Sequence, residues 1–376
     1  MSSAIQSGDA PRGARKPRRA GPLAALGRLL RRLLLGAVLL VLALLAPVAW
    51  VETMCRPGEP PTAAVEPILP PEHRRPESNT LLTYPEWHIV HAYADYAAVI
   101  RRGAPHDFAF VPAVGQYWTS LCALTRASGP MGGPSDDYRL MTHVIGVSFT
   151  AELLLKAAYE ETVGRLFVRL RGPRHAPLDK LSAQQAAAYA AFLRQTPWYR
   201  WDFSRDALAL EVGATDSLRD RERAVALGLE YRAKALYARA IAQGVAATGA
   251  DELTMRSVVR GLAPEVLAGI EGVTVIAERP EGVEVETPRY ATFTALAREI
   301  AAAGGDFVEI AGNDEILVTS LAPEPGPELS GGDLSVLAVM PRQGNPGVRE
   351  LRLLRVDALA DLLRDPAVEV EHVHDY

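Results

Sequence analysis

Two histidines and an aspartate at helical spacing are the residues best suited to chemistry: His88, His91 and Asp95. Steps of three and four residues place their side chains on one face of a helix. Two imidazoles and a carboxylate form a suitable ligand set for zinc or iron. The same stripe is also typical of the water-facing side of an amphipathic helix. We therefore expect either a metal site or a solvated helix face, and we favour the solvated face.

A second polar cluster interrupts the apolar segment 140–166 and consists of His143, Glu152, Lys156 and Glu160. The last three are four residues apart, so they stack along one helix face as a ladder of opposite charges. Buried charges must be paired or functional, and we expect a structural salt bridge inside a bundle. One alternative is a site of carboxylates and histidines in the bundle core, shared with His88. The Glu-x-x-His repeats that are typical of di-iron bundles are, however, absent. Another alternative is that this segment spans the membrane a second time. We disfavour it because ionisable side chains are costly in the middle of a bilayer.

Two more polar groups occur further along the chain. Glu222, Glu230 and Lys234 lie among arginines, and such mixed charge predicts a solvated face; the arginines are Arg219, Arg221, Arg223 and Arg232. His372 and His374 alternate along a predicted strand, so both point to one of its faces. The two histidines could bind a metal ion at the surface, but we favour the alternative that they lie on a frayed terminal strand without a ligand.

Motifs of the common enzyme classes are absent from the sequence. It contains no Gly-rich phosphate loop with its lysine, no G-x-G-x-x-G after a predicted strand, no G-x-S-x-G and no paired C-x-x-C. These absences argue mildly against those classes and not against catalysis as such. A non-enzymatic function is therefore the favoured interpretation.

An uncharged apolar run from Leu33 to Val51 indicates where the protein resides. Its 19 residues come close to the roughly 20 that a helix needs to cross a bilayer. Eight arginines and lysines precede the run, against the single acid Asp9. By the positive-inside rule, we predict a single-pass protein of the inner (cytoplasmic) membrane, with its N-terminus in the cytoplasm and its bulk in the periplasm or outside. A cleaved signal peptide is the alternative, but Pro47, Val48 and Ala49 make a poor cleavage site.

The remainder of the chain is acidic, because the net charge is −5 despite the basic leader. Such a surface is a poor nucleic-acid binder, since binding depends on neutralising phosphates. The leader itself suits anionic lipid headgroups. Two cysteines, Cys55 and Cys122, do not make a disulfide framework, although they could pair in an oxidising compartment. We favour an exposed Cys55 and a buried Cys122 that are not bonded to each other.

Composition and periodicity divide the chain into five parts. Residues 1–28 are a basic leader expected to be disordered, 29–51 a transmembrane helix, and 52–79 a Pro-rich spacer that lifts the next domain off the membrane. Residues 80–250 are expected to form a helical domain with an aromatic loop at 198–203 and a bend at Gly146. Its helices are predicted near 83–102, 111–127, 137–171, 182–196 and 217–247.

The period changes to alternation in the last part of the chain, 251–376. Strands are predicted at 273–277, 282–287, 307–311, 315–322, 335–340, 349–356 and 368–374, with helices at 289–303 and 357–364. The orders ββαββ and ββαβ suggest two degenerate copies of one unit. Helices followed by strands indicate an α+β protein with an antiparallel sheet, joined to an N-terminal transmembrane helix.

Two functions fit these observations. The favoured one is an inner-membrane-anchored, exported binding or scaffold module for a protein partner or an apolar ligand, including lipid held by the apolar segment 111–127. The alternative is a membrane-associated metalloenzyme with zinc or iron at His88, His91 and Asp95, assisted by His143 or Glu152.

Overall fold

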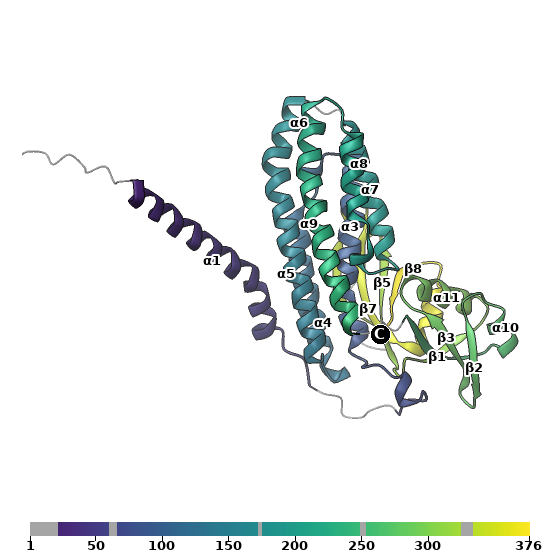
Figure 1. The fold of residues 1–376 in the computed structure, drawn as a ribbon. Coiled ribbons are helices and arrows are strands. Elements are labelled where there is room, and N and C mark those ends of the chain that lie inside the picture. Colours follow the sequence, from purple (N-terminus) through teal and green to yellow (C-terminus); the bar gives the residue numbers. More distant parts are fainter. Residues whose placement is uncertain (1–21, 60–65, 172–174, 249–252, 325–333) are drawn as a thin grey trace, which may run out of the picture. The chain divides into compact units, whose positions relative to one another are not determined.

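A computed structural model describes residues 22–59, 66–171, 175–248, 253–324 and 334–376 (Figure 1). The chain divides into two compact units, Met1–Ala46 and Pro47–Tyr376. Helix α1 (Pro22–Met54) begins in the first unit and ends in the second. It starts inside the leader predicted to be disordered, and the rest of that leader lies outside the described residues.

Within the described residues, two helical segments are long and apolar enough to cross a membrane. The first, Leu30–Met54, lies near the N-terminus and has a mean hydropathy of 2.7. The second, Asp136–Leu170, has a mean hydropathy of 1.3. By length and composition, the N-terminal helix is therefore a candidate for the predicted anchor.

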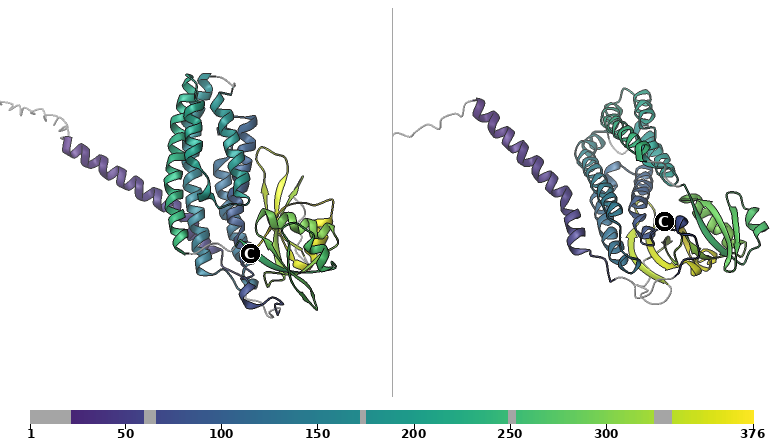
Figure 2. Two further views of the ribbon diagram at one scale, coloured as in Figure 1. Left: turned by 45° about the vertical axis from the view of Figure 1, so that its right-hand side comes forward. Right: turned by 60° about the horizontal axis from the view of Figure 1, so that its bottom comes forward.

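The second unit opens with helices that lie side by side (Figures 1 and 2). The central one, α3, packs against α4, α5 and α7, and α9 packs against α7 and α8. The predicted helices are confirmed to within a few residues, and α8 was missed beside the aromatic segment. The elements are η1 (Pro71–His73), α2 (Asn79–Leu82), α3 (Tyr84–Arg102), η2 (Pro105–Asp107), α4 (Phe110–Ala127), η3 (Gly129–Met131), α5 (Asp136–Tyr159), the π-helical turn η4 (Glu160–Gly164), α6 (Arg165–Arg171), α7 (Pro177–Leu193), η5 (Trp198–Arg200), α8 (Phe203–Gly213) and α9 (Leu218–Thr248).

The long apolar helix α5 is interrupted at a different place from the one predicted. Its start is capped by Ser135, whose hydroxyl accepts a hydrogen bond from the Tyr138 amide. The bend expected at Gly146 is absent, and the irregularity is the π-helical turn η4. Gly146 instead permits close packing, because a Cβ there would lie 2.5 Å from Tyr117 and 2.8 Å from Trp118 of α4.

The strands form two four-stranded antiparallel sheets of identical topology. Their orders are β2-β3-β1-β4 and β6-β7-β5-β8. Each copy therefore has three strands, a helix and a fourth strand that returns beside the first. The elements are β1 (Thr254–Arg260), α10 (Pro264–Ala268), β2 (Thr274–Arg279), β3 (Gly282–Pro288), α11 (Ala291–Ala302), β4 (Asp306–Ile310), β5 (Glu315–Ala322), β6 (Leu334–Pro341), β7 (Val348–Arg355), η6 (Val356–Ala358), α12 (Leu359–Arg364) and β8 (Glu369–His374).

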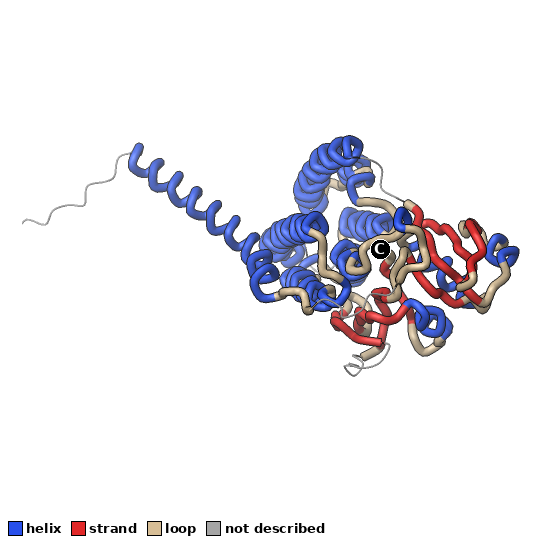
Figure 3. The backbone as a smooth tube through the Cα atoms, turned by 90° about the horizontal axis from the view of Figure 1, so that it is seen from below, coloured by secondary structure: helices blue, strands red, loops and turns tan. Residues whose placement is uncertain are grey.

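The α+β class is confirmed, but the predicted division into ββαββ and ββαβ is wrong. Strand β1 was missed, and β5 opens the second copy instead of closing the first. A register shift between Val258 and Val259 buries two consecutive valines, which breaks the alternation that reveals a strand. Both sheets contribute to one core with α11 and α12, and their strands lie beside the helices (Figure 3).

The Pro-rich segment is packed where the structure describes it, so the expectation of a free spacer is wrong for residues 66–78. The Leu69 side chain is fully buried, and its amide donates a hydrogen bond to Glu309 at 2.9 Å. Arg75 donates to the C-terminal Tyr376 carbonyl at 2.6 Å. These contacts bind the segment to β4 and to the C-terminus, which follows β8.

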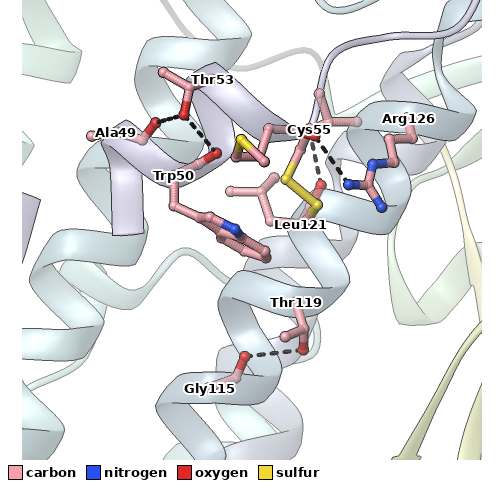
Figure 4. The surroundings of a disulfide bond; sticks show 11 residues. Ala49, Trp50, Thr53, Cys55, Gly115, Thr119, Leu121 and Arg126 are labelled. Carbon is pink, nitrogen blue, oxygen red and sulfur yellow. Dashed lines mark hydrogen bonds between the residues drawn. A yellow bond between two sulfur atoms is a disulfide. The ribbon is translucent and has the colours of Figure 1, made fainter. Parts of the chain in front are cut away.

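Cys55 and Cys122 form a disulfide, which corrects the expectation of two unbonded cysteines (Figure 4). The bond joins the residue after α1 to α4, and both side chains are buried. Arg126 of α4 adds a hydrogen bond to the Met54 carbonyl at 3.0 Å. The C-terminal end of α1 is therefore held firmly on the helical part of the second unit.

Candidate functional site

The stripe on α3 is buried, so the favoured interpretation of a solvated face is wrong. His88, His91 and Asp95 are 4%, 3% and 5% exposed. The helix has Pro85 in its first turn, where proline is favoured, and it ends before Gly103. The stripe faces α4 on one side and the second sheet on the other, as the contacts below show. It therefore forms an internal polar site.

His88 is held as a neutral side chain on the α4 side of this site. Its Nε2 lies 3.0 Å from the Ala113 carbonyl, to which a neutral ring donates a proton. The rings of Tyr117 and Phe149 meet it edge-on. Burial lowers the pKa of His88 to about 4, although the hydrogen bond to Ala113 opposes this shift.

His91 has neither ring nitrogen in a hydrogen bond. Its Nδ1 lies 3.5 Å from a carboxylate oxygen of Glu371 in β8. Burial lowers the pKa of His91 well below its usual value, and the positive charge of Arg349 lowers it further. The ring is therefore neutral near pH 7, and its contact with Glu371 is not an ion pair under those conditions.

Arg349 of β7 links the helix to the sheet by binding two carboxylates. Its Nη1 lies 3.1 and 3.0 Å from the two Asp95 oxygens, and its Nε lies 2.7 Å from Glu371. The Gln343 amide also donates to Asp95 at 3.0 Å. Burial raises the pKa of Asp95, and Arg349 opposes that change. Such charge-assisted pairs fix the position of α3 on the sheet.

A bulge in β8 brings its side chains to this site. Thr319 of β5 pairs with His372 and Ser320 pairs with Val370, so Glu371 is an extra residue. The His372 ring stacks on Trp87 of α3 at 3.3 Å between centroids. His374 lies 4.7 Å from His372, and its Nε2 is 2.7 Å from the Thr319 hydroxyl. Both histidines are at most 1% exposed, which corrects the expectation of a frayed strand.

The predicted metal ligands each have a separate environment. His88 contacts a backbone carbonyl, His91 faces Glu371, and Asp95 pairs with Arg349. Across the ranges that the structure describes, no group of three or more His, Cys, Asp or Glu side chains is arranged to hold a metal ion. The cavity beside these residues has about 10 Å³ of free space. That volume is at the lower limit for one water molecule.

The second polar cluster pairs with α9 and not along α5. Its helix-to-helix ion pairs are Glu152 with Lys234 at 2.6 Å, Lys156 with Glu230 at 3.1 Å, and Glu160 with Arg223 at 3.1 Å. The expected salt bridge inside the bundle is therefore present, with partners on another helix. His143 instead lies 2.6 Å from Glu52 at the end of α1.

Only part of the charge on α9 faces water, so the prediction of a solvated face is wrong for Arg219 and Arg223. Arg219 and Arg223 are at most 1% exposed, and both contact Asp179 of α7 at 3.2 Å. Arg219 also binds Glu222 at 2.8 Å. Sequence reasoning missed this burial because the partners lie on helices distant in sequence. Arg221 and Arg232 are exposed, as predicted.

Sequence reasoning also missed Arg349 and Glu371, which complete the site on α3. Strand alternation gives no signal for Glu371, because it is the bulged residue. Comparisons of this chain with protein-family models, with curated proteins and with solved structures give no match. The function must therefore be argued from the geometry of the molecule.

Proposed function

We propose that the chain is an exported, membrane-anchored binding module for a protein or apolar ligand, and that its binding surface is the outer side of α5. One observation carries the proposal: this side of α5 is apolar and exposed to solvent. We call it the α5 strip, and its members are Leu140, Met141, Val144, Ser148, Ala151, Leu155 and Ala158.

On α5 the outer side is apolar and the inner side is charged, which is the reverse of a helix on a water-soluble bundle. Leu140, Val144 and Leu155 are 65%, 51% and 72% exposed. The strip contains no charged residue, whereas Glu152 and Lys156 are turned toward α9. Exposed apolar patches that are contiguous mark interaction sites in soluble proteins.

Export is supported by the disulfide together with the candidate anchor. Disulfides persist in oxidising compartments and are rare in the cytosol. Cys55 directly follows the candidate span Leu30–Met54. A disulfide at this position favours the orientation with the second unit outside the cytoplasm, in the periplasm of a bacterial cell.

Thiol labelling of the full chain in spheroplasts tests this proposal. Both native cysteines are bonded, so an introduced cysteine is the only free thiol among the described residues. We expect a membrane-impermeant maleimide to label Leu208→Cys on α8, where the native side chain is 58% exposed. We expect Leu155→Cys on the α5 strip to be protected. Labelling of Leu208→Cys only after lysis would exclude export, and equal labelling of both positions would exclude a covered strip.

A further inference from the structure

We infer that the ligand of the α5 strip is the lipid of the membrane that α1 enters. This inference rests on the proposed function and names the ligand class of that surface. Lipid acyl chains form no hydrogen bonds, so they need no polar partner on the protein. The strip offers them methyl, methylene and thioether groups. Its one hydroxyl, that of Ser148, can form a hydrogen bond within its own helix.

The dimensions of the strip fit this ligand. The distance from Leu140 to Ala158 is about 27 Å at the helical rise per residue. A helix that lies in the plane of one leaflet buries its apolar face along its whole length, so a strip of this length is in contact with lipid throughout. Charged residues occur on both sides of the strip and not within it: Asp136, Asp137 and Arg139 precede it, and Glu161, Arg165 and Arg169 follow it.

The strip also begins where the candidate anchor ends. Glu52 lies in the last turns of α1, 3.4 Å from Arg139 and 2.6 Å from His143 at the start of α5. The disulfide holds the adjacent residue Cys55 on α4. If α1 crosses the bilayer, these contacts hold the first turns of α5 near the membrane surface. A second copy of the chain would not be delivered to the strip in this way.

Other sides of the helical part keep contact with water. Arg221 and Arg232 on α9 have side chains that are 63% and 58% exposed, and Arg205 on α8 is 64% exposed. Guanidinium groups are costly in hydrocarbon. Helix α9 also exposes Val225, Leu229 and Leu236, but it carries two of these arginines as well, whereas the α5 strip contains no charged residue. The lipid contact is therefore assigned to the α5 side.

Collision measurements on nitroxide labels test this inference. The full chain is placed in liposomes of phosphatidylethanolamine and phosphatidylglycerol, with a label at Val144→Cys or Leu155→Cys. Molecular oxygen concentrates in lipid, and a neutral nickel chelate concentrates in water. Leu40→Cys within the candidate span serves as the lipid control, and Leu208→Cys as the water control.

We expect both strip labels to collide more often with oxygen than with the nickel chelate, as Leu40→Cys does, and the order to reverse at Leu208→Cys. Low collision rates with both reagents would mean that protein covers the strip, for example a second copy. That outcome overturns the lipid inference and leaves the proposed binding function standing. Frequent collisions with the nickel chelate would overturn both. An intact Cys55–Cys122 bond in each variant checks that the fold is retained.

Discussion

His88 should make the protein lose stability on acidification, starting near pH 6.5. The folded chain holds His88 with a pKa lowered to about 4 by burial, against 6.5 for an unperturbed histidine. Between these two values, the unfolded chain binds a proton that the folded chain does not. The free energy of unfolding therefore falls as pH decreases from 6.5 toward 4 and is not lowered further by this group below 4.

The size of the effect follows from the separation of the two pKa values. A difference of about 2.5 units corresponds to about 3 kcal/mol in full, of which about 2 kcal/mol is lost between pH 7.5 and pH 5. His88→Gln isolates this term, because an amide can still donate to the Ala113 carbonyl but does not titrate. The fall in stability between pH 7.5 and pH 5 should be smaller in this variant by about 2 kcal/mol.

Urea unfolding of the full chain in detergent micelles at the two pH values measures this difference. His175→Gln is the control, since His175 is exposed, and it should leave the pH dependence of the wild type unchanged. His91, His372 and His374 are buried as well and keep their own acid sensitivity in the variant. An identical loss of stability in the wild type and in His88→Gln would refute the reasoning, because it would show that His88 is not held neutral by burial.

Two further substitution pairs test the packing of the helices. Arg223→Ala removes a fully buried guanidinium and leaves the buried Glu160 carboxylate without its cation, although Asp179 keeps Arg219, so we expect a loss of about 3–5 kcal/mol in urea unfolding. Arg221→Ala on the exposed side should change stability by less than about 0.5 kcal/mol. Gly146→Ala should cost about 1–3 kcal/mol because its Cβ meets Tyr117, and Gly115→Ala, with open space around it, should stabilise α4 by up to about 1 kcal/mol. A stable Arg223→Ala would show that the buried pairs are not native, and equal effects at the two glycines would contradict the close packing of α4 and α5.

Local signals made part of this structure predictable. The predicted helix at 83–102 agrees with α3 to within one residue, and strand alternation located most of the two sheets. The sequence indicated that one α+β unit occurs twice, but it did not reveal strand β1, because the bulge in that strand buries Val258 and Val259 together. The α+β class therefore followed from periodicity, while the correct boundary between the two copies required the pairing of strands.

The candidate site was only half predictable for a related reason. The spacing of His88, His91 and Asp95 correctly placed them on one helix face, but spacing does not say what that face contacts. The carboxylate of Asp95 is bound by Arg349, more than 250 residues later in the chain. That partner comes from β7, so it becomes visible only once α3 packs on the second sheet. The same limit applies to Arg223: the density of charges around it in sequence suggested contact with water, although its partners Glu160 and Asp179 lie on η4 and α7.

The buried charges and the α5 strip are consistent with a single physical cause. A helix bundle in water gains stability by turning charge outward and apolar side chains inward, because ion pairs taken out of water lose much of their solvation. In α5 the order is reversed: Glu152 and Lys156 point to α9, as does Glu160 in the adjoining turn η4, and leucine and valine point outward. An outer side in contact with lipid removes the benefit of outward charge and makes mutual pairing the best environment for these groups. Protein stability should then fall when the full chain is transferred from liposomes to a short-chain detergent that leaves the strip wet, and Leu155→Ser should reduce that difference.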